Sequence, residues 1–498
     1  MGSESNISWE FLKNLADTLD SYRIRVLIDA KEDILNAGIY NEDQYYNIFF
    51  KTFDEEQLKT SLLCYLNNNK NKKDFNLLKK FSKKNEIDIR RTLSLLELLK
   101  NENLLAFKIV YDKIQEENSE ENILTFKDIL IETKNINLSE TKSVYEPVSI
   151  IFESNVCSGC GLCSGICPVN CLNVYNGFGK IDQDKCIRCG LCYYHCPRTY
   201  LPITILNMLQ SDSSEIENYS NIGHYIGVYS ARTKIKEISE ICQDGGISST
   251  CLHYLFENNQ IDYALGATMS QTPWRPEPKL LKNKSDVLLT SGTKYVNSPN
   301  LRILNELNDN GSNIAIVGVP CMMQGLLKSQ IYNIGIPSLN KVKYLIGIFC
   351  MESFSYQSFL EICNRLNVKV DDIRKTDINK GKFFVYTKSG EELTIPVKEI
   401  SNLAREDCEV CFDLTSESAD ISLGSTGSPS GWNTVIIRTL KGKKLFENLI
   451  KEDLIEYKDI KDVKPGFPML EKIALSKKNN CYKHIEQKQK ENKRIPQY

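Results

Sequence analysis

Two rows of cysteine residues have the spacing of metal-cluster ligands. The first row, "CSGCGLCSGICPVN", begins at Cys157, and the second row, "CIRCGLCYYHCPRTY", begins at Cys186. Each row follows the pattern C-x2-C-x2-C-x3-C-P, which binds 4Fe-4S clusters; in two-cluster proteins the fourth cysteine of each row ligates the other cluster. A structural zinc site normally has four ligands in C-x2-C pairs. Two complete rows therefore favour clusters over zinc.

The spacing predicts a bacterial-type, two-cluster ferredoxin module. Gly159, Gly161 and Gly190 support it, because glycine lets backbone amides approach sulfur. Cys171 lies just outside the pattern and is interpreted as a buried thiol. The predicted ligands of one cluster are Cys157, Cys160, Cys163 and Cys196, and those of the other are Cys186, Cys189, Cys192 and Cys167.

Four further cysteines lie in the C-terminal half of the chain. Cys321 and Cys350 follow the ends of predicted strands, where α/β folds place their functional groups. Cys408 and Cys411 form a C-x2-C pair. Taken separately, each has another interpretation, since cysteine is commonly buried and a C-x2-C pair could bind zinc or form a redox dithiol.

Three glycine-rich segments could bind a phosphate or the edge of a cofactor, because loops that precede helices present free amides. The candidate residues are Gly245, Gly246, Ser248 and Ser249; Ser291, Gly292, Thr293, Lys294 and Tyr295; and Gly424, Ser425, Gly427, Gly431 and Trp432. No segment matches G-x-G-x-x-G or a Walker loop, so neither a standard nicotinamide site nor a nucleotide-hydrolysing site is supported. Ordinary turns are the alternative interpretation.

Strands and helices alternate from about residue 222 onward. Buried strands are predicted over residues 225–231, 261–268, 313–320 and 342–350, and helices over residues 249–259 and 299–311. This alternation indicates an α/β domain with a parallel or mixed sheet. The polar tail from about Lys472 is expected to be helical or extended over a partner.

The N-terminal residues 1–140 are rich in helical patterns. Residues 74–113 could form a winged-helix unit that binds DNA, since "KKFSKKNEIDIRR" is basic. A solvated helix face explains these charges equally well, so docking of a partner subunit is the favoured interpretation.

Composition narrows the class of protein. The net charge of -2 in 498 residues gives no general attraction to nucleic acid or to an anionic membrane. The chain starts with a polar, helix-like segment and no apolar stretch has the length of a membrane span, so a cytoplasmic protein is expected. Eighteen cysteines in such a chain favour metal or redox chemistry over disulfides.

The C-terminal half resembles a known family. The segments "DGGISSTCLHYL", "SGTKYVNSPNL", "VGVPCMMQGL", "IGIFCMESF", "CEVCFDLTSESADISLGSTGS" and "GWNTVIIRT" are similar to the beta subunits of coenzyme F420-reducing hydrogenase and F420-dependent formate dehydrogenase over about residues 222–470. The preceding cysteine rows resemble the arrangement in the F420-oxidising subunit of dehydrogenases that act on reduced F420. The resemblance implies bound FAD, contacts between FAD and the glycine-rich loops, and hydride exchange with F420. It also implies a third 4Fe-4S cluster, ligated by Cys321, Cys350, Cys408 and Cys411.

These observations together predict a multidomain protein of α+β and α/β class. Its expected parts are a helical domain (1–140), the ferredoxin module (141–210), an α/β flavin and iron-sulfur domain (211–470) and a polar tail (471–498). Because F420 transfers two electrons and a cluster accepts one, FAD is expected to stand between them. Hydride transfer needs no side-chain acid or base, so no catalytic residue is assigned.

The expected function is an F420-dependent oxidoreductase of anaerobic archaeal metabolism. It would pass electrons through three 4Fe-4S clusters to or from a partner, either ferredoxin or a complex of hydrogenase, formate dehydrogenase or heterodisulfide reductase type. One alternative is a ferredoxin:F420 oxidoreductase that acts alone. Another is an electron-transfer adaptor subunit without catalytic activity.

Overall fold

The computed structural model describes residues 148–498 apart from residues 176, 187–190, 200, 202–217, 308–311, 333–338, 340, 492 and 497. Nearly all of the described residues belong to one compact unit, Pro147–Cys186, Leu191–Gln330 and Ile336–Tyr498. The predicted helical domain, its winged-helix part and the ligand Cys189 lie outside the described residues.

The segment with the cysteine rows is built from very short elements, which leave most of its backbone free to surround ligands. They are α9 (Ser149–Glu153), α10 (Leu162–Gly165), α11 (Leu191–Tyr194), β1 (Leu172–Tyr175) and β2 (Phe178–Ile181). The two strands pair antiparallel. The 3-10 helix η1 (Asn300–Glu306) packs on α10, where a Cβ at Gly165 would collide with the carbonyl oxygen of Leu301. Glycine at 165 therefore permits this close approach.

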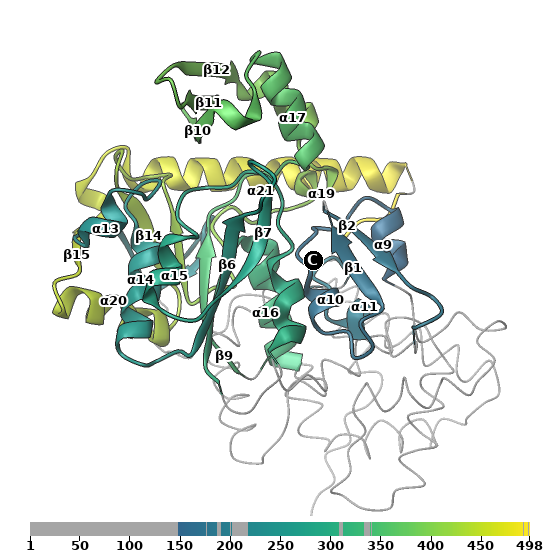
Figure 1. Ribbon diagram of the computed structural model, residues 1–498, viewed down its shortest axis with the longest axis horizontal. Helices are drawn as coiled ribbons and strands as arrows, with labels where there is room; N and C mark the ends of the chain where they lie inside the picture. Colours follow the sequence, from purple (N-terminus) through teal and green to yellow (C-terminus); the bar gives the residue numbers. More distant parts are fainter. Residues whose placement is uncertain are drawn as a thin grey trace, which may run out of the picture. The chain divides into compact units, whose positions relative to one another are not determined.

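The rest of the unit is organised around an eight-stranded mixed sheet with the order β15-β5-β14-β13-β9-β8-β6-β7 (Figure 1). Its four central strands, β13, β9, β8 and β6, are parallel to their neighbours in this series, and β14 and β7 run antiparallel on either side. The bounds are β5 (Gly227–Thr233), β6 (Tyr263–Met269), β7 (Pro276–Leu281), β8 (Ile314–Gly318), β9 (Val342–Ile348), β13 (Ile421–Gly424), β14 (Asn433–Ile437) and β15 (Ile455–Asp459).

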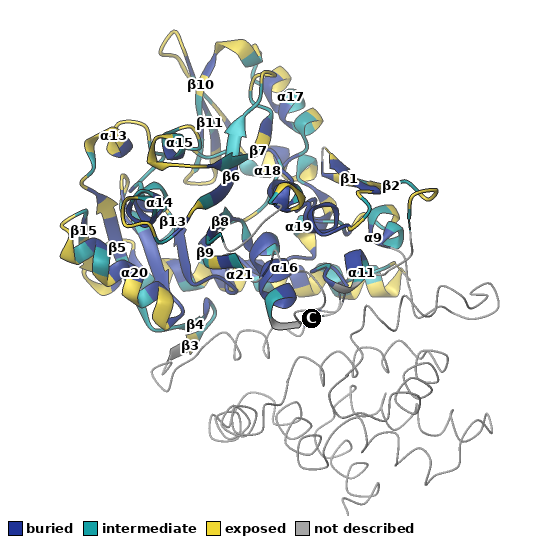
Figure 2. Ribbon diagram, turned by 60° about the horizontal axis from the view of Figure 1, so that its bottom comes forward, coloured by how far each residue is buried: buried dark blue, intermediate teal, exposed yellow. Residues whose placement is uncertain are grey.

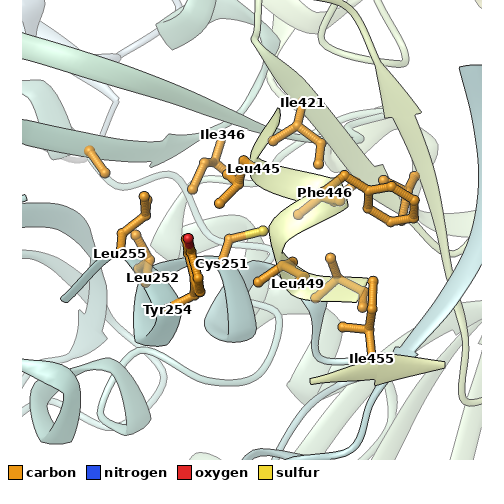
Figure 3. Packing of buried hydrophobic residues seen from close by; sticks show 14 of the residues in the cluster. Cys251, Leu252, Tyr254, Leu255, Ile346, Ile421, Leu445, Phe446, Leu449 and Ile455 are labelled. Atoms are coloured by element: carbon orange, nitrogen blue, oxygen red, sulfur yellow. The ribbon is translucent and has the colours of Figure 1, made fainter. Parts of the chain in front are cut away.

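The central strands are apolar because helices cover both faces of the sheet. On one face, α14 (Ile247–Glu257) and α20 (Leu440–Lys451) bury the large core cluster that includes Cys251, Leu255, Ile346 and Leu449 (Figure 3). On the other face, α21 (Gly466–Lys490) packs through Leu470 and Ala474 against residues of β5 and β14. Alternate residues of β14 enter the two clusters, as the two-residue period of a strand requires. Figure 2 shows the buried strands between these helices.

A second, three-stranded sheet lies outside the main one. It has the order β10-β11-β12 with both pairs antiparallel, and it shares a core cluster with α17. Its elements are β10 (Ile373–Asn379), β11 (Lys382–Thr387), β12 (Glu392–Pro396) and α17 (Tyr356–Arg365). The sequence did not predict this sheet, because charged and polar residues interrupt the apolar residues of its strands.

The remaining elements lie between the strands of the two sheets and in the loops. They are β3 (Asn218–Ser220), β4 (Gly223–Tyr225), α13 (Lys236–Ser239), α15 (Lys284–Leu288), α16 (Pro320–Tyr332), α18 (Val397–Ile400), α19 (Glu406–Glu409), and the 3-10 helices η3 (Val370–Asp372), η4 (Ser401–Leu403) and η5 (Ile460–Asp462).

The mixed α/β class predicted from the sequence is confirmed for the described residues. Strands β5, β6, β8 and β9 lie within a few residues of their predicted positions. The segment predicted as a helix over 299–311 instead forms the 3-10 helix η1, since it follows Pro299 and ends in polar, turn-forming residues. The polar tail is helical in α21. None of the described helices has the length and apolar character needed to cross a membrane.

Candidate metal centres and cofactor loops

The first thiol set, defined as Cys157, Cys160, Cys163 and Cys196, surrounds one cavity. Apolar side chains such as Phe152, Val174 and Leu162 complete its wall. Three of the thiols come from the loop before α10 and from α10 itself, whereas Cys196 follows α11 in the second row. The structure thus brings together the four cysteines that the spacing assigned to one cluster, including the one that crosses from the other row.

Backbone amides in the first set point toward sulfur. The amide of Gly159 donates to Sγ of Cys157 over 3.4 Å, and the amide of Arg198 donates to Sγ of Cys196 over 3.4 Å. Gly159 has a φ of 65°, which side-chain-bearing residues rarely adopt. Burial raises the pKa of Cys157 to about 12, and the neighbouring Cys196 adds to the rise. Amide donors of this kind stabilise sulfur that carries negative charge.

The second thiol set is defined as Cys167, Cys186, Cys189 and Cys192, of which Cys189 lies outside the described residues. Cys167 and Cys192 are buried in one cluster of side chains, and Cys186 packs against it. Cys171, which the spacing left out, is in contact with this set. Its Sγ lies 3.5 Å from Sγ of Cys167, and its amide donates to the same sulfur over 3.4 Å. Only the folded chain shows this contact.

The third thiol set is defined as Cys321, Cys350, Cys408 and Cys411. Cys321 lies in the first turn of α16 directly after β8, and Cys350 follows β9. Because β8 and β9 are neighbouring parallel strands, their carboxyl ends meet at one edge of the sheet. The amide of Ser353 donates to Sγ of Cys408 over 3.4 Å.

The thiols of the third set are electrostatic neighbours. The pKa of Cys350 is raised to about 11, mainly by burial and in part by Cys411. Burial also raises the pKa of Cys408, and Cys350 and Cys411 add to it. The pKa of Cys321 is similarly raised by burial first, then by Cys160 of the first set and by Cys411. The four cysteines therefore gather at one place, which borders the first set.

Buried cations surround the first and third sets. Arg198, Lys328, Arg405 and Lys477 are each at most 9% exposed. Lys477 donates to the carbonyl oxygen of Cys350, and Lys328 donates to the carbonyl oxygen of Cys196 over 3.3 Å. Buried charges are costly unless opposite charges accompany them. Cations concentrated in a thiol-rich interior therefore fit a bound group with net negative charge, such as a cluster held by four thiolates.

A mononuclear metal site fits less well. Within the part of the chain that the structure describes, no three His, Cys, Asp or Glu side chains converge closely enough to hold a single ion. Zinc–sulfur bonds are about 2.3 Å long, so the ligands of one zinc ion lie within about 4 Å of one another. A four-iron cluster is larger than a single ion, so its four thiols lie farther apart.

The first and third glycine-rich segments meet at the amino end of β14. The side-chain oxygen of Asn433 accepts a hydrogen bond of 3.1 Å from the amide of Ile247, which begins α14. A Cβ at Gly245 would lie 2.5 Å from the amide of Asn433. Ser248 and Ser249 lie in the first turn of α14. Sequence reasoning missed Asn433, although it follows Trp432 directly.

The predicted residues of the third glycine-rich segment have several different surroundings. Gly424 lies against the ring of Phe349, and Gly427 lies near the start of α21. Trp432 is buried, and the guanidinium of Arg232 lies 4.7 Å from its ring centre. Ser425 and Gly431 are exposed. The structure therefore does not gather all five predicted residues at one point.

The second glycine-rich segment contains features that fit a ligand. Oγ of Ser291 is buried and has no hydrogen-bond partner among the described residues. Nothing lies within 4 Å of the Cβ position of Gly292, so space is open beside it. Nζ of Lys294 donates to the carbonyl oxygens of Thr290 and Ser291, over 2.6 and 2.9 Å, and burial lowers the pKa of Lys294 to about 8. The segment therefore offers a hydroxyl and a cation to the edge of a cofactor.

Two carboxylates that the sequence did not indicate lie near the first and second glycine-rich segments. Asp377 of β10 accepts a hydrogen bond of 3.5 Å from the hydroxyl of Tyr295, which itself accepts from the amide of Ile378 over 2.9 Å. Asp244 precedes Gly245, and burial raises its pKa to about 6, with Asp377 adding to the rise and Lys375 opposing it. These contacts connect the first and second glycine-rich segments through β10. No local motif marks β10, so only the tertiary structure reveals its role.

Comparison with known proteins identifies the class of both parts. Residues 149–197 match a 4Fe-4S dicluster domain, so the first part is an iron-sulfur domain. Residues 228–305 and 311–463 match the N-terminal and C-terminal parts of the coenzyme F420 hydrogenase/dehydrogenase beta subunit. The protein is thus an iron-sulfur, F420-linked oxidoreductase subunit with an electron-transfer role.

Two curated relatives support this class. The chain is 36% identical over 271 residues to the beta subunit of the coenzyme F420 hydrogenase of Methanosarcina barkeri, and the match covers 54% of this chain and 93% of the relative. It is 33% identical over 357 residues to a component of the F(420)H(2) dehydrogenase of Methanosarcina mazei, and this match covers 69% of this chain and 95% of the relative.

A solved structure agrees with these relatives. One chain of the F420-reducing [NiFe] hydrogenase complex from Methanosarcina barkeri matches with a TM-score of 0.54 and 36% identity, over 56% of this chain and 97% of that one. The chain belongs to the family of coenzyme F420 hydrogenase/dehydrogenase beta subunits, as the sequence resemblance predicted.

Proposed function

We propose that the chain binds FAD and exchanges hydride between FAD and coenzyme F420, with three 4Fe-4S clusters connecting the flavin to a partner protein. The family and the dicluster domain support the F420-linked and iron-sulfur parts of this proposal. FAD, when bound, supplies the conversion between two-electron and one-electron chemistry that F420 and the clusters require.

The single observation that carries the proposal is the position of the third thiol set. Two of its cysteines lie at the carboxyl ends of β8 and β9, where α/β sheets bind ligands, and Cys321 is an electrostatic neighbour of Cys160 in the first set. The third set therefore borders both the cofactor edge of the sheet and the dicluster domain. A cluster at this position would suit electron transfer between the flavin and the dicluster domain.

The chain's own residues would hold these groups. The twelve predicted thiolates would ligate the clusters, and the buried cations beside the first and third sets would offset the negative charge. Ser291 and Lys294 would donate to the cofactor from the second glycine-rich segment, and the amides at the start of α14 would donate from the first.

The test uses the anaerobically purified full chain. Three clusters of four irons each predict about twelve irons per chain, whereas about eight would eliminate the third cluster. Bound flavin should bleach when reduced F420 is added, and the protein should then reduce a viologen dye. Bleaching by NADH instead, with no response to F420, would overturn the deazaflavin assignment.

The same preparation separates the two rival functions. Reduction of ferredoxin by the isolated chain, with reduced F420 as the donor and no second protein, would support an oxidoreductase that acts alone. Flavin and full iron content without any response to F420 would support an adaptor role. Co-purification of a second protein, lost when residues 1–140 are deleted, would support docking by the N-terminal residues.

A further inference from the structure

A buried charge cluster joins the dicluster domain to the α/β part. Arg198, which follows Cys196 and Pro197, is 1% exposed, and Asp407 of α19 is 4% exposed. Nη2 of Arg198 lies 3.4 Å from Oδ2 of Asp407, and its Nη1 donates to the hydroxyl of Tyr498 over 2.6 Å. That hydroxyl donates to the carbonyl oxygen of Val410 over 2.5 Å. The guanidinium is therefore held in one position by two different partners.

Arg198 is also an electrostatic neighbour of thiols in two different sets. Its own amide donates to Cys196 of the first set, and its charge acts on Cys160 of the same set. Cys321 and Cys411 of the third set are among the groups that act on Arg198. Cys160 also acts directly on Cys321. Arg198 therefore lies at the border between the first and third thiol sets.

The protein supplies too little negative charge for this position. Arg198 shares Asp407 with a second arginine, because Nε of Arg405 lies 2.9 Å from Oδ1 of Asp407. Nε of Arg198 is buried and has no hydrogen-bond partner among the described residues. A buried arginine that shares its carboxylate and keeps a free donor is unfavourable unless another anion is present. Thiolate-bound clusters on both sides would supply that anion.

We propose that Arg198 is a positioning residue for one-electron transfer between the third and first thiol sets, raising the reduction potential of the clusters on both sides. This inference rests on the proposed function, since it requires a cluster in the third set. Each transfer moves one electron and makes or breaks no bond, and no proton is required. A fixed positive charge favours the reduced form of either cluster, because that form carries one more negative charge.

The position of Arg198 also gives the order of the three thiol sets along the electron path. The amide of Arg198 contacts Cys196 of the first set, and its guanidinium is an electrostatic neighbour of Cys321 and Cys411 of the third set. The dicluster domain would therefore exchange electrons with the third set through the first set. The second set would be the farthest of the three from the flavin.

The experiment compares Arg198→Met with Arg198→Lys in the full chain. Dithionite titrations followed by electron paramagnetic resonance give a midpoint for each cluster, and Cys163→Ser, Cys192→Ser and Cys350→Ser assign the signals. In Arg198→Met, the first-set and third-set midpoints should shift to more negative potential while the second-set midpoint stays. Arg198→Lys should recover most of the shift, which a purely steric role would not predict. Arg365→Met, on α17 and paired with Glu361, is the control and should shift nothing.

A second measurement remains informative if Arg198→Met loses its clusters. In the reduced wild-type chain, neighbouring clusters broaden each other's signals, so Cys408→Ala should sharpen the first-set signal more than the second-set signal. Sharpening of the second-set signal instead would overturn the order. Unchanged midpoints in Arg198→Met at full iron content would overturn the role of Arg198. Both readouts use dithionite, so failure of F420 to reduce the protein leaves them interpretable, whereas about eight irons per chain would remove the third cluster and with it this inference.

Discussion

Lys477 of α21 donates a hydrogen bond from its ammonium to the carbonyl oxygen of Cys350, although the two residues are 127 positions apart in the chain. Lys477 is 5% exposed, and the thiols of Cys411, Cys350 and Cys408 raise its pKa against the effect of burial. The long helix that covers one face of the sheet thus places a positive charge beside the third thiol set.

We expect Lys477→Met to shift the third-set midpoint to more negative potential, because the reduced cluster loses a neighbouring positive charge. A dithionite titration followed by electron paramagnetic resonance measures this shift. Lys483→Met, on the same helix but exposed, is the matched control. Equal midpoints for Lys477→Met and wild type, at equal iron content, would show that Lys477 serves packing alone.

The crossing of the two cysteine rows leads to a second prediction. Cys196→Ser should alter the signal of the first thiol set, because Cys196 lines the cavity of Cys157, Cys160 and Cys163. Cys167→Ser should alter the signal of the second set. The measurement is the electron paramagnetic resonance spectrum of each reduced variant, compared with Cys163→Ser and Cys192→Ser. Spectra in which Cys196→Ser resembles Cys192→Ser would contradict the assignment.

The position of Asp244 makes stability depend on pH. Burial raises its pKa from 3.8 to about 6, so the folded chain binds this proton more tightly than the unfolded chain does. Between about pH 4 and pH 6, raising the pH therefore removes a proton that stabilises the fold, and stability falls. Asp244→Asn should abolish this contribution, and urea unfolding midpoints at several pH values measure the difference from wild type.

An exposed carboxylate provides the control for Asp244. Asp184→Asn removes a carboxylate from an exposed turn and should leave the pH dependence as in the wild type. A wild-type chain whose midpoint rises relative to Asp244→Asn between about pH 4 and pH 6 would contradict the direction of the shift.

The core beneath the sheet should be sensitive to cavities. Leu449 of α20 is fully buried in the cluster of Figure 3, so Leu449→Ala should lower the free energy of unfolding by about 2–5 kcal/mol. Leu440, at the start of the same helix, is 40% exposed, and Leu440→Ala should cost far less. Urea denaturation of both variants gives the comparison. Equal losses would mean that α20 does not pack as described.

Local patterns in the sequence were sufficient to predict the class of protein and several strands of the α/β part. The spacing of the cysteine rows indicated cluster ligands, because a short loop must place three thiols around one cluster. Apolar runs predicted β5, β6, β8 and β9, since strands covered on both faces need continuous apolar residues. The alternating, charged strands of the small sheet lack that pattern, so they were not predicted.

The sequence by itself determined which residues have the chemistry to hold clusters, because ligand type and spacing are properties of a short segment. Only the tertiary structure decided that thiols of the dicluster domain and of the α/β part are neighbours, as Cys160 and Cys321 are. It also decided that Arg198 and Lys477 lie among those thiols. These contacts join segments that are distant in the chain, and they depend on how helices and strands pack rather than on any local spacing.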